Sequence, residues 1–112
     1  MFDDFDIIYS YSRKQALSDG VLIDVSDVAR KSDFLLPTVV TSNLLNQIDA
    51  ENQLPVLFAV FHDKWKFRPS EDDMMTTQTL SKTGRVLTVI LHIGFGDNES
   101  EKVLTMMLPE DN

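Results

Sequence analysis

The chain has 112 residues, of which 43% are hydrophobic and 25% charged, a composition typical of one folded domain spanning residues 1–112. It has no cysteine, which excludes disulfides, thiolate metal sites and cysteine nucleophiles, and we expect a cytoplasmic protein. No segment approaches the ~20 apolar residues of a membrane span, and 18 acidic against 10 basic residues give a net charge of −8, which disfavours direct nucleic-acid binding.

The N-terminal residues predict an extended segment followed by a short helix. Apolar and polar side chains alternate over much of residues 2–11, which indicates a short strand or an extended arm. Ser12 and Gln15 have the spacing of a capping box, in which each side chain satisfies a backbone group of the first helical turn. Gly20 stands where that helix needs a residue of left-handed conformation. We therefore expect a helix between Ser12 and Gly20.

The next segment predicts a strand, a second helix and an extended crossing. Residues 21–25 are apolar and β-branched, as in a short strand or a rigid connection. Ser26 or Asp27 is expected to cap a short helix running through Lys31, whose positive charge suits a helix C-terminus. Residues 34–37 predict an extended crossing, because the residue before a proline avoids helix.

The middle of the chain predicts two helices. Thr41 or Ser42 is expected to cap the first, which carries apolar residues on one face, and the polar residues 49–53 break its pattern. Residues 54–67 carry apolar side chains at helical spacing, with Pro55 suited to a first helical turn. The same residues also allow a strand, but the length of the segment favours a helix.

The C-terminal half predicts strands at residues 74–80, 85–94 and 102–108, joined by turns at 81–84 and 96–101. The expected fold class is therefore α+β, with short helices of the N-terminal half packed on a C-terminal three-stranded antiparallel β-meander. One face of the central strand is expected to meet the core, opposite Leu104 or Met106 of the next strand. Its residues are Leu87, Val89, Leu91 and Ile93.

Two parts of the sequence carry a resemblance to a known family. The first combines Tyr9-Ser10-Tyr11-Ser12-Arg13 and Gln15-Ala16 with the run DGVLIDV at residues 19–25 and Ala29-Arg30, and the second is VLTMMLPED at residues 103–111. They resemble the opening and the ending of a family of small bacterial proteins of unknown function found on plasmids, phages and other mobile elements. The resemblance does not extend to the middle of the chain. It implies a mobile-element context and no activity.

The two histidines are the candidate catalytic or metal-binding residues. His62 is followed by Asp63, but adjacent residues of a helix point in different directions and do not orient each other. His92 lies in a predicted strand, without the spacing of zinc ligands. We therefore expect no catalytic residue, no metal and no cofactor. The alternative is a small enzyme that uses His62 or His92 with carboxylates on an unknown substrate.

The charge and the resemblance together lead to a functional hypothesis. It is a non-enzymatic, acidic interaction protein of a mobile genetic element, whose partner is a protein with a basic surface and neither nucleic acid nor a membrane. Its sharpest form is an inhibitor of a host defence system, such as an anti-CRISPR or antirestriction protein. Homo-oligomerisation through an uncovered strand edge is compatible with it. The candidate contact residues are Asp3, Asp4, Tyr9, Tyr11, Glu71, Asp72, Asp73, Asp97 and Glu99.

Residues 64–68 interleave Lys and Arg with aromatic side chains, which suits stacking on nucleic-acid bases. A net acidic chain lacks the electrostatic footprint of a nucleic-acid-binding protein, however. Lysine stems can instead pack beside a buried Trp65. We therefore expect this segment to be structural.

Overall fold

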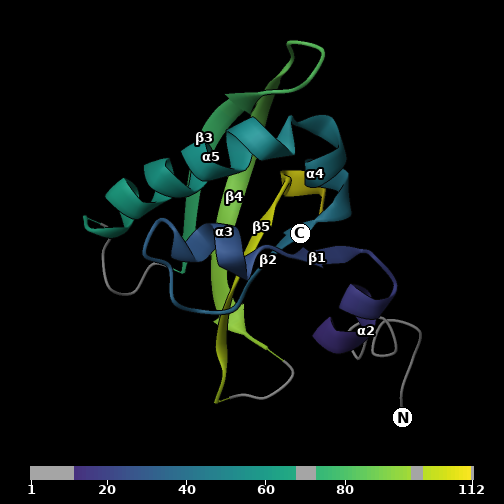
Figure 1. Cartoon of the computed structure of the whole chain (residues 1–112), viewed down its shortest axis with the longest axis vertical. Coiled ribbons are helices and arrows are strands. Elements are labelled where there is room, and N and C mark those ends of the chain that lie inside the picture. The colour runs from purple at the N-terminus through teal and green to yellow at the C-terminus, as the bar shows by residue number, and fades with distance from the viewer. Residues whose placement is uncertain (1–11, 68–72, 97–99, 112) are drawn as a thin grey trace.

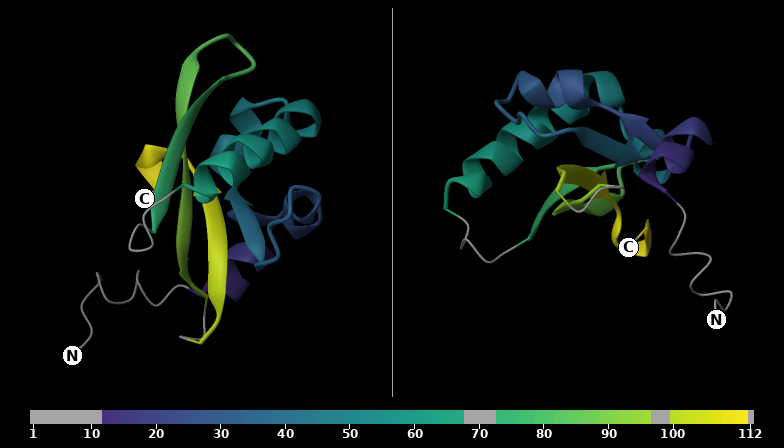
Figure 2. Two further views of the ribbon diagram at one scale, coloured as in Figure 1. Left: turned by 90° about the vertical axis from the view of Figure 1, so that its left-hand side faces the viewer. Right: turned by 90° about the horizontal axis from the view of Figure 1, so that it is seen from below.

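A computed structural model describes residues 12–67, 73–96 and 100–111. Its centre is a β-sheet with helices packed on one face (Figure 1; Figure 2). The strands are β1 (Leu22–Asp24), β2 (Thr38–Thr41), β3 (Met74–Leu80), β4 (Val86–Phe95) and β5 (Lys102–Met107). The helices are α2 (Arg13–Ser18), α3 (Ser26–Arg30), α4 (Ser42–Gln47), α5 (Ala50–Trp65) and the 3₁₀ helix η1 (Pro109–Asp111).

The sheet is mixed and has the strand order β1-β2-β5-β4-β3. Strands β3, β4 and β5 are antiparallel neighbours, β2 lies parallel to β5, and β1 pairs antiparallel with β2. The α+β class is confirmed. The predicted three-stranded antiparallel meander is corrected, because the described sheet has five strands and is mixed. Strand β2 was not predicted, because its four residues are all buried and show no polar alternation.

The main core lies between the sheet and the helices. The predicted inward face of β4 is confirmed, since Val89 and Leu91 are buried in this core while Leu87 and Ile93 pack against it. The predicted cross-strand partners are confirmed as well, because Ile93 pairs with Leu104 and Leu91 with Met106. From the helix side, α5 contributes Leu54, Leu57, Phe58 and Phe61.

Helix α5 confirms the helical interpretation of residues 54–67 but starts earlier than predicted. The polar residues before Leu54 form its first turn, where Gln53 Oε1 accepts a 2.7 Å hydrogen bond from the Asp49 N–H. Pro55 therefore lies in the second turn and not in the first. Because proline has no N–H, the Glu51 carbonyl lacks its usual intrahelical partner there. No helix in the described ranges is long and apolar enough to cross a membrane.

Helix α2 ends as the sequence predicts, and at its start the Ser12 half of the predicted capping box is confirmed. The Ser12 hydroxyl accepts a 2.9 Å hydrogen bond from the Gln15 N–H. At the other end, Gly20 has a φ of +77°. The Gly20 N–H donates to the Leu17 carbonyl at 3.2 Å and the Val21 N–H to the Ala16 carbonyl at 3.0 Å, the bonding pattern of a Schellman motif.

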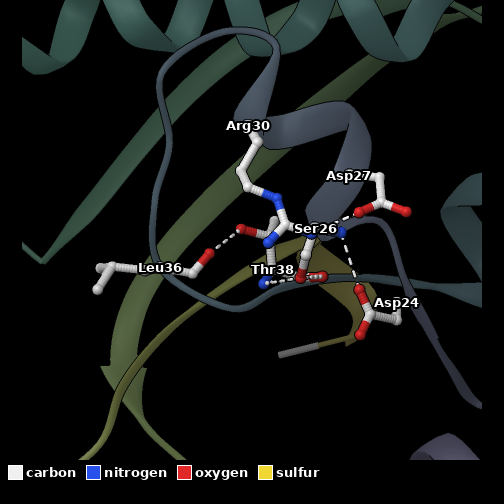
Figure 3. A network of polar contacts seen from close by, with 6 residues as sticks. All are labelled: Asp24, Ser26, Asp27, Arg30, Leu36 and Thr38. Carbon is white, nitrogen blue, oxygen red and sulfur yellow. Dashed lines mark hydrogen bonds and ion pairs between the residues drawn. The ribbon is translucent and has the colours of Figure 1, made fainter.

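The start of α3 differs from the prediction. Its N-cap residue is Val25, which has no capping side chain, so neither Ser26 nor Asp27 caps the helix. The Ser26 hydroxyl instead joins α3 to β2, accepting from the Thr38 N–H at 2.9 Å and donating to the Thr38 carbonyl at 3.3 Å (Figure 3). Asp24 Oδ1 accepts from the Ser26 N–H at 2.8 Å. At the start of α4, by contrast, the predicted Thr41 cap is confirmed.

Candidate functional site

The two histidines lie on opposite sides of the sheet. His62 is a half-buried residue of α5, and its ring meets the edge of Phe34 at a centroid distance of 5.7 Å. His92 pairs with Thr105 on β5, and its neighbour Leu91 belongs to the core on the helix side, so His92 points to the other face. The structure therefore does not bring the two candidate residues together. Among the described residues, no group of three or more His, Asp or Glu could hold a metal ion.

The aromatic and basic segment after His62 is partly structural. Trp65 is half-buried and packs edge-on against Phe34 at a centroid distance of 5.5 Å. Lys64 and Lys66 are exposed beside it, as expected for lysines that flank an aromatic side chain, although Trp65 is only half-buried and was predicted to be buried. Arg68 lies outside the described residues.

Of the predicted contact residues, only Asp73 belongs to the described part of the chain. Its side chain is exposed, and its backbone carbonyl accepts a 2.7 Å hydrogen bond from the Ile93 N–H at the start of β3. The other predicted contact residues lie outside the described residues, namely Asp3, Asp4, Tyr9, Tyr11, Glu71, Asp72, Asp97 and Glu99.

The negative charge is unevenly distributed along the chain. The described residues carry eleven acidic and nine basic side chains, a net charge of −2. The remaining seven acids and a single base, a net charge of −6, fall in residues 1–11, 68–72 and 97–99. Three short segments of sequence therefore account for most of the charge of −8.

The described residues that border these segments lie at one end of the sheet. Asp73 meets Ile93 where β3 begins, and the Gly96 N–H donates to the Glu101 carbonyl at 2.8 Å where β4 ends and β5 begins. Ser12, which follows the first segment, lines the same groove as Gly96. This is the lower end of the sheet in Figure 1. We call it the β3–β4–β5 end, defined by Ser12, Asp73, Gly96 and Ser100.

A groove of ≈ 760 Å³ extends from Phe95 and Gly96, near the β3–β4–β5 end, to Met107 at the other end of β5 and to Asp111 beyond it. Arg13 and Asp111 are its charged residues. The Arg13 guanidinium donates to Thr105 Oγ1 and to the Leu104 carbonyl, each at 3.3 Å, and so ties α2 to β5. The lining residues are Ser12, Arg13, Ala16, Val21, Leu22, Thr41, Ser42, Asn43, Phe95, Gly96, Thr105, Met107 and Asp111.

Two exposed aromatic residues adjoin the acidic segments and were missed from the sequence. Phe67 is 86% exposed just before residues 68–72, and Phe95 is 64% exposed just before Gly96. Strand alternation places Phe95 on the inward face with Ile93, but Phe95 is the last residue of β4 and is not buried. The exposure of Phe67 could have been predicted from its position beyond Trp65, which is the last apolar residue at helical spacing.

The Asp24 carboxyl has a perturbed ionisation. Hydrogen bonding from Ser26, chiefly from its backbone N–H, lowers the pKa of the Asp24 carboxyl, and the positive charges of Arg13 and Arg30 lower it further. Asp24 also lines a smaller hollow of ≈ 250 Å³ between α2 and β2. Since its hydrogen bonds serve the β1–α3 junction, this carboxylate is structural.

No family model matches the sequence, and no curated protein or solved structure matches it either. The resemblance to a family of mobile elements therefore stays a prediction.

Proposed function

We propose that this chain is a non-enzymatic interaction protein of a mobile genetic element, which presents acidic residues to a basic surface of a protein partner. In its most specific form, the partner is a host defence protein that handles nucleic acid, such as a CRISPR or restriction nuclease. The acidic residues would then occupy or block the basic path of the nucleic acid. An anti-CRISPR or antirestriction role follows from this form of the proposal.

The observation that carries the proposal is the uneven distribution of acidic residues along the sequence, together with where the described residues that border the acid-rich segments lie. Residues 1–11, 68–72 and 97–99 hold seven of the 18 acids, and the described residues that border them share the β3–β4–β5 end. Acids that are joined to one end of a domain act on a partner together, because their fields add over a distance of ~8 Å at physiological ionic strength.

The exposed aromatic residues next to the acidic segments also favour the β3–β4–β5 end as the contact surface. Phe67 and Phe95 are large apolar side chains that remain 86% and 64% exposed. Aromatic residues are enriched at protein–protein interfaces and frequently supply most of the binding energy. In this arrangement the acids accelerate the encounter, while the phenylalanines contribute the buried contact area.

The test starts with capture of a partner from a bacterial host lysate, identification by mass spectrometry and purification of that protein. Binding is then measured by surface plasmon resonance at increasing salt concentration. We expect the association rate to fall with salt more than the dissociation rate rises, because long-range attraction is screened. The variant Glu71→Gln/Asp72→Asn/Asp73→Asn should associate with the partner more slowly than the wild type does at the same salt concentration.

A matched control removes the same number of charges elsewhere. Asp49, Glu51 and Glu110 are exposed and lie near the start of α5 or beyond the end of β5, away from the β3–β4–β5 end. The variant Asp49→Asn/Glu51→Gln/Glu110→Gln should bind almost as the wild type does. Binding that is unchanged in high salt and in the first triple variant would contradict the charge hypothesis. Tyr9, Tyr11, Phe67 and Phe95 would then be the contacts to test.

A further inference from the structure

We propose that β3 pairs with β3 of a second copy of this chain, antiparallel and about a twofold axis, so that the sheet continues across a homodimer. This inference goes beyond the proposed function and does not depend on it. It rests on the open edge of β3, on the direction of its backbone groups and on the charges at its two ends.

Strand β3 lies at the outer edge of the sheet, and within the described residues it pairs only with β4 (Figure 1). Its seven residues, MMTTQTL, include no charged residue and no proline. Proteins usually protect an edge strand with lysine, proline or a bulge, because its free N–H and C=O groups bind other strands. Strand β3 has neither the lysine nor the proline.

The hydrogen bonds at its two ends show which backbone groups face away from the sheet. The Ile93 N–H donates to the Asp73 carbonyl at 2.7 Å, and the Ser81 N–H to the Arg85 carbonyl at 2.8 Å. Bonding alternates along an antiparallel pair, so residues of odd number bond to β4 and those of even number point outward. The Leu80 carbonyl fits this rule, since it accepts from Gln53 Nε2 at 2.7 Å instead of from β4.

The outward groups fix one register with full overlap. Two antiparallel copies of β3 bring Thr76 of one chain opposite Gln78 of the other, with the twofold axis at Thr77. Each Thr76 and Gln78 then exchanges both backbone hydrogen bonds with the second copy. Met74 lies opposite Leu80 of the second copy in the same register.

The side chains of this edge suit the pairing. Met74 is 39% exposed, and Leu80 and Val86, which form a cross-strand pair, are 55% and 64% exposed. All three project from the face opposite the helices, because Met75 of β3 and Leu87 of β4 belong to the helix side. The proposed register places Met74 against Leu80 of the second copy and so covers apolar surface on both chains.

The charges favour the antiparallel orientation. Asp73 precedes β3, whereas Lys82 and Arg85 follow it, and all three side chains are exposed. The twofold axis brings Asp73 of each chain beside Ser81 and Lys82 of the other. A parallel arrangement would instead place like charges together. The occupant that this edge fits is therefore a second copy of the same strand.

The first experiment measures sedimentation velocity and amide hydrogen exchange over a range of protein concentrations. We expect the dimer fraction to rise with concentration, and the amides of Thr76 and Gln78 to exchange more slowly as it does. The amides of Met75, Thr77 and Thr79 should be protected at every concentration, because they bond to β4. A chain that stays monomeric throughout, or alternate amides that never become protected, would overturn the proposal.

The second experiment uses variants at exposed positions. Thr76→Lys/Gln78→Lys places like charges opposite each other at two symmetric places, and should weaken the dimer by about tenfold or more. The control Thr88→Lys/Glu110→Gln changes the net charge equally, with one lysine on β4, and should retain the dimer. Circular dichroism checks that each monomer folds. A dimer unaffected by the first variant uses another surface, which would refute the pairing of β3.

A charge exchange tests the orientation. Asp73→Lys and Lys82→Glu should each weaken the dimer, because each creates like-charge contacts across the axis. The double variant Asp73→Lys/Lys82→Glu should restore much of the affinity, since opposite charges meet again. Failure of the double variant to improve on both single variants would exclude the antiparallel register.

Discussion

Thr41 and Asp111, seventy residues apart in the sequence, are joined by a 2.7 Å hydrogen bond from the Thr41 hydroxyl to Asp111 Oδ2. The same hydroxyl accepts from the Leu44 N–H at 3.3 Å and so caps α4. Asp111 Oδ1 accepts from Asn43 Nδ2 at 3.2 Å, and Oδ2 also accepts from the Leu108 N–H at 3.0 Å. One carboxylate thus connects η1 to the junction of β2 and α4.

Replacing Asp111 with alanine should lower the free energy of unfolding by about 1–2 kcal/mol, because three donors lose their acceptor together. Urea denaturation measures the change. The control is Glu110→Ala, since Glu110 is an exposed neighbour in the same 3₁₀ helix, and it should cost little. A Thr41→Val/Asp111→Ala cycle should show coupling, and strictly additive costs would mean that the Thr41–Asp111 bond contributes nothing.

Features that depend on a few neighbouring residues could be predicted from the sequence. The Ser12 cap, the left-handed Gly20 and the strand at residues 74–80 are set by local pattern, and the structure confirms them. Strand β2 could not be predicted, because it is short, buried and pairs in parallel with β5, more than sixty residues later. The same reason explains Ser26, whose hydroxyl bonds to Thr38 instead of capping α3.

Gly20 gives a test of backbone conformation without side-chain clash. Its φ is +77°, and a Cβ atom built on it would meet no heavy atom within 4 Å. Gly20→Val should therefore destabilise the protein by about 1–2 kcal/mol through the left-handed backbone alone. Gly20→Asn should cost less, because asparagine tolerates this conformation better. Equal melting temperatures for the valine variant and the wild type would contradict the structural role of the Schellman motif.

The candidate site shows the same limit of sequence reasoning. The acidic segments were identified from composition, but their bordering residues share one end of the sheet only because β3 begins where β4 ends and β5 begins. Phe95 has the same strand alternation as Ile93 but is exposed, and alternation alone does not reveal where the helix layer stops. Both features depend on the tertiary arrangement of elements and not on local pattern.

Asp24 predicts a pH dependence of stability. Its pKa is lower in the folded state than the ordinary value, so its contribution to stability is fully present above that ordinary value and is lost as the pH falls through the folded-state pKa. Asp24→Asn should therefore reduce the free energy of unfolding at pH 7. The difference from wild type should shrink below about pH 4.

Urea denaturation at pH 7 and at pH 3 measures this difference. Asp63→Asn serves as the control, because it removes one exposed acid from α5 and changes the net charge equally. A difference between wild type and Asp24→Asn that is the same at both pH values would show that ionisation of Asp24 does not stabilise the fold.

His92 and Gly94 give the last prediction. A Cβ atom on Gly94 would lie 2.8 Å from His92 Cε1 and 3.1 Å from Nδ1, so the imidazole occupies the space that any larger residue would need. Gly94→Ala must displace this half-buried ring and should cost about 1 kcal/mol of stability. In a His92→Ala background the ring is absent, and the same change should become neutral or stabilising, since alanine loses less backbone entropy than glycine. Urea denaturation of the four variants in this cycle gives the coupling energy. Equal costs of Gly94→Ala in both backgrounds would place the conflict in the backbone and not in the ring of His92.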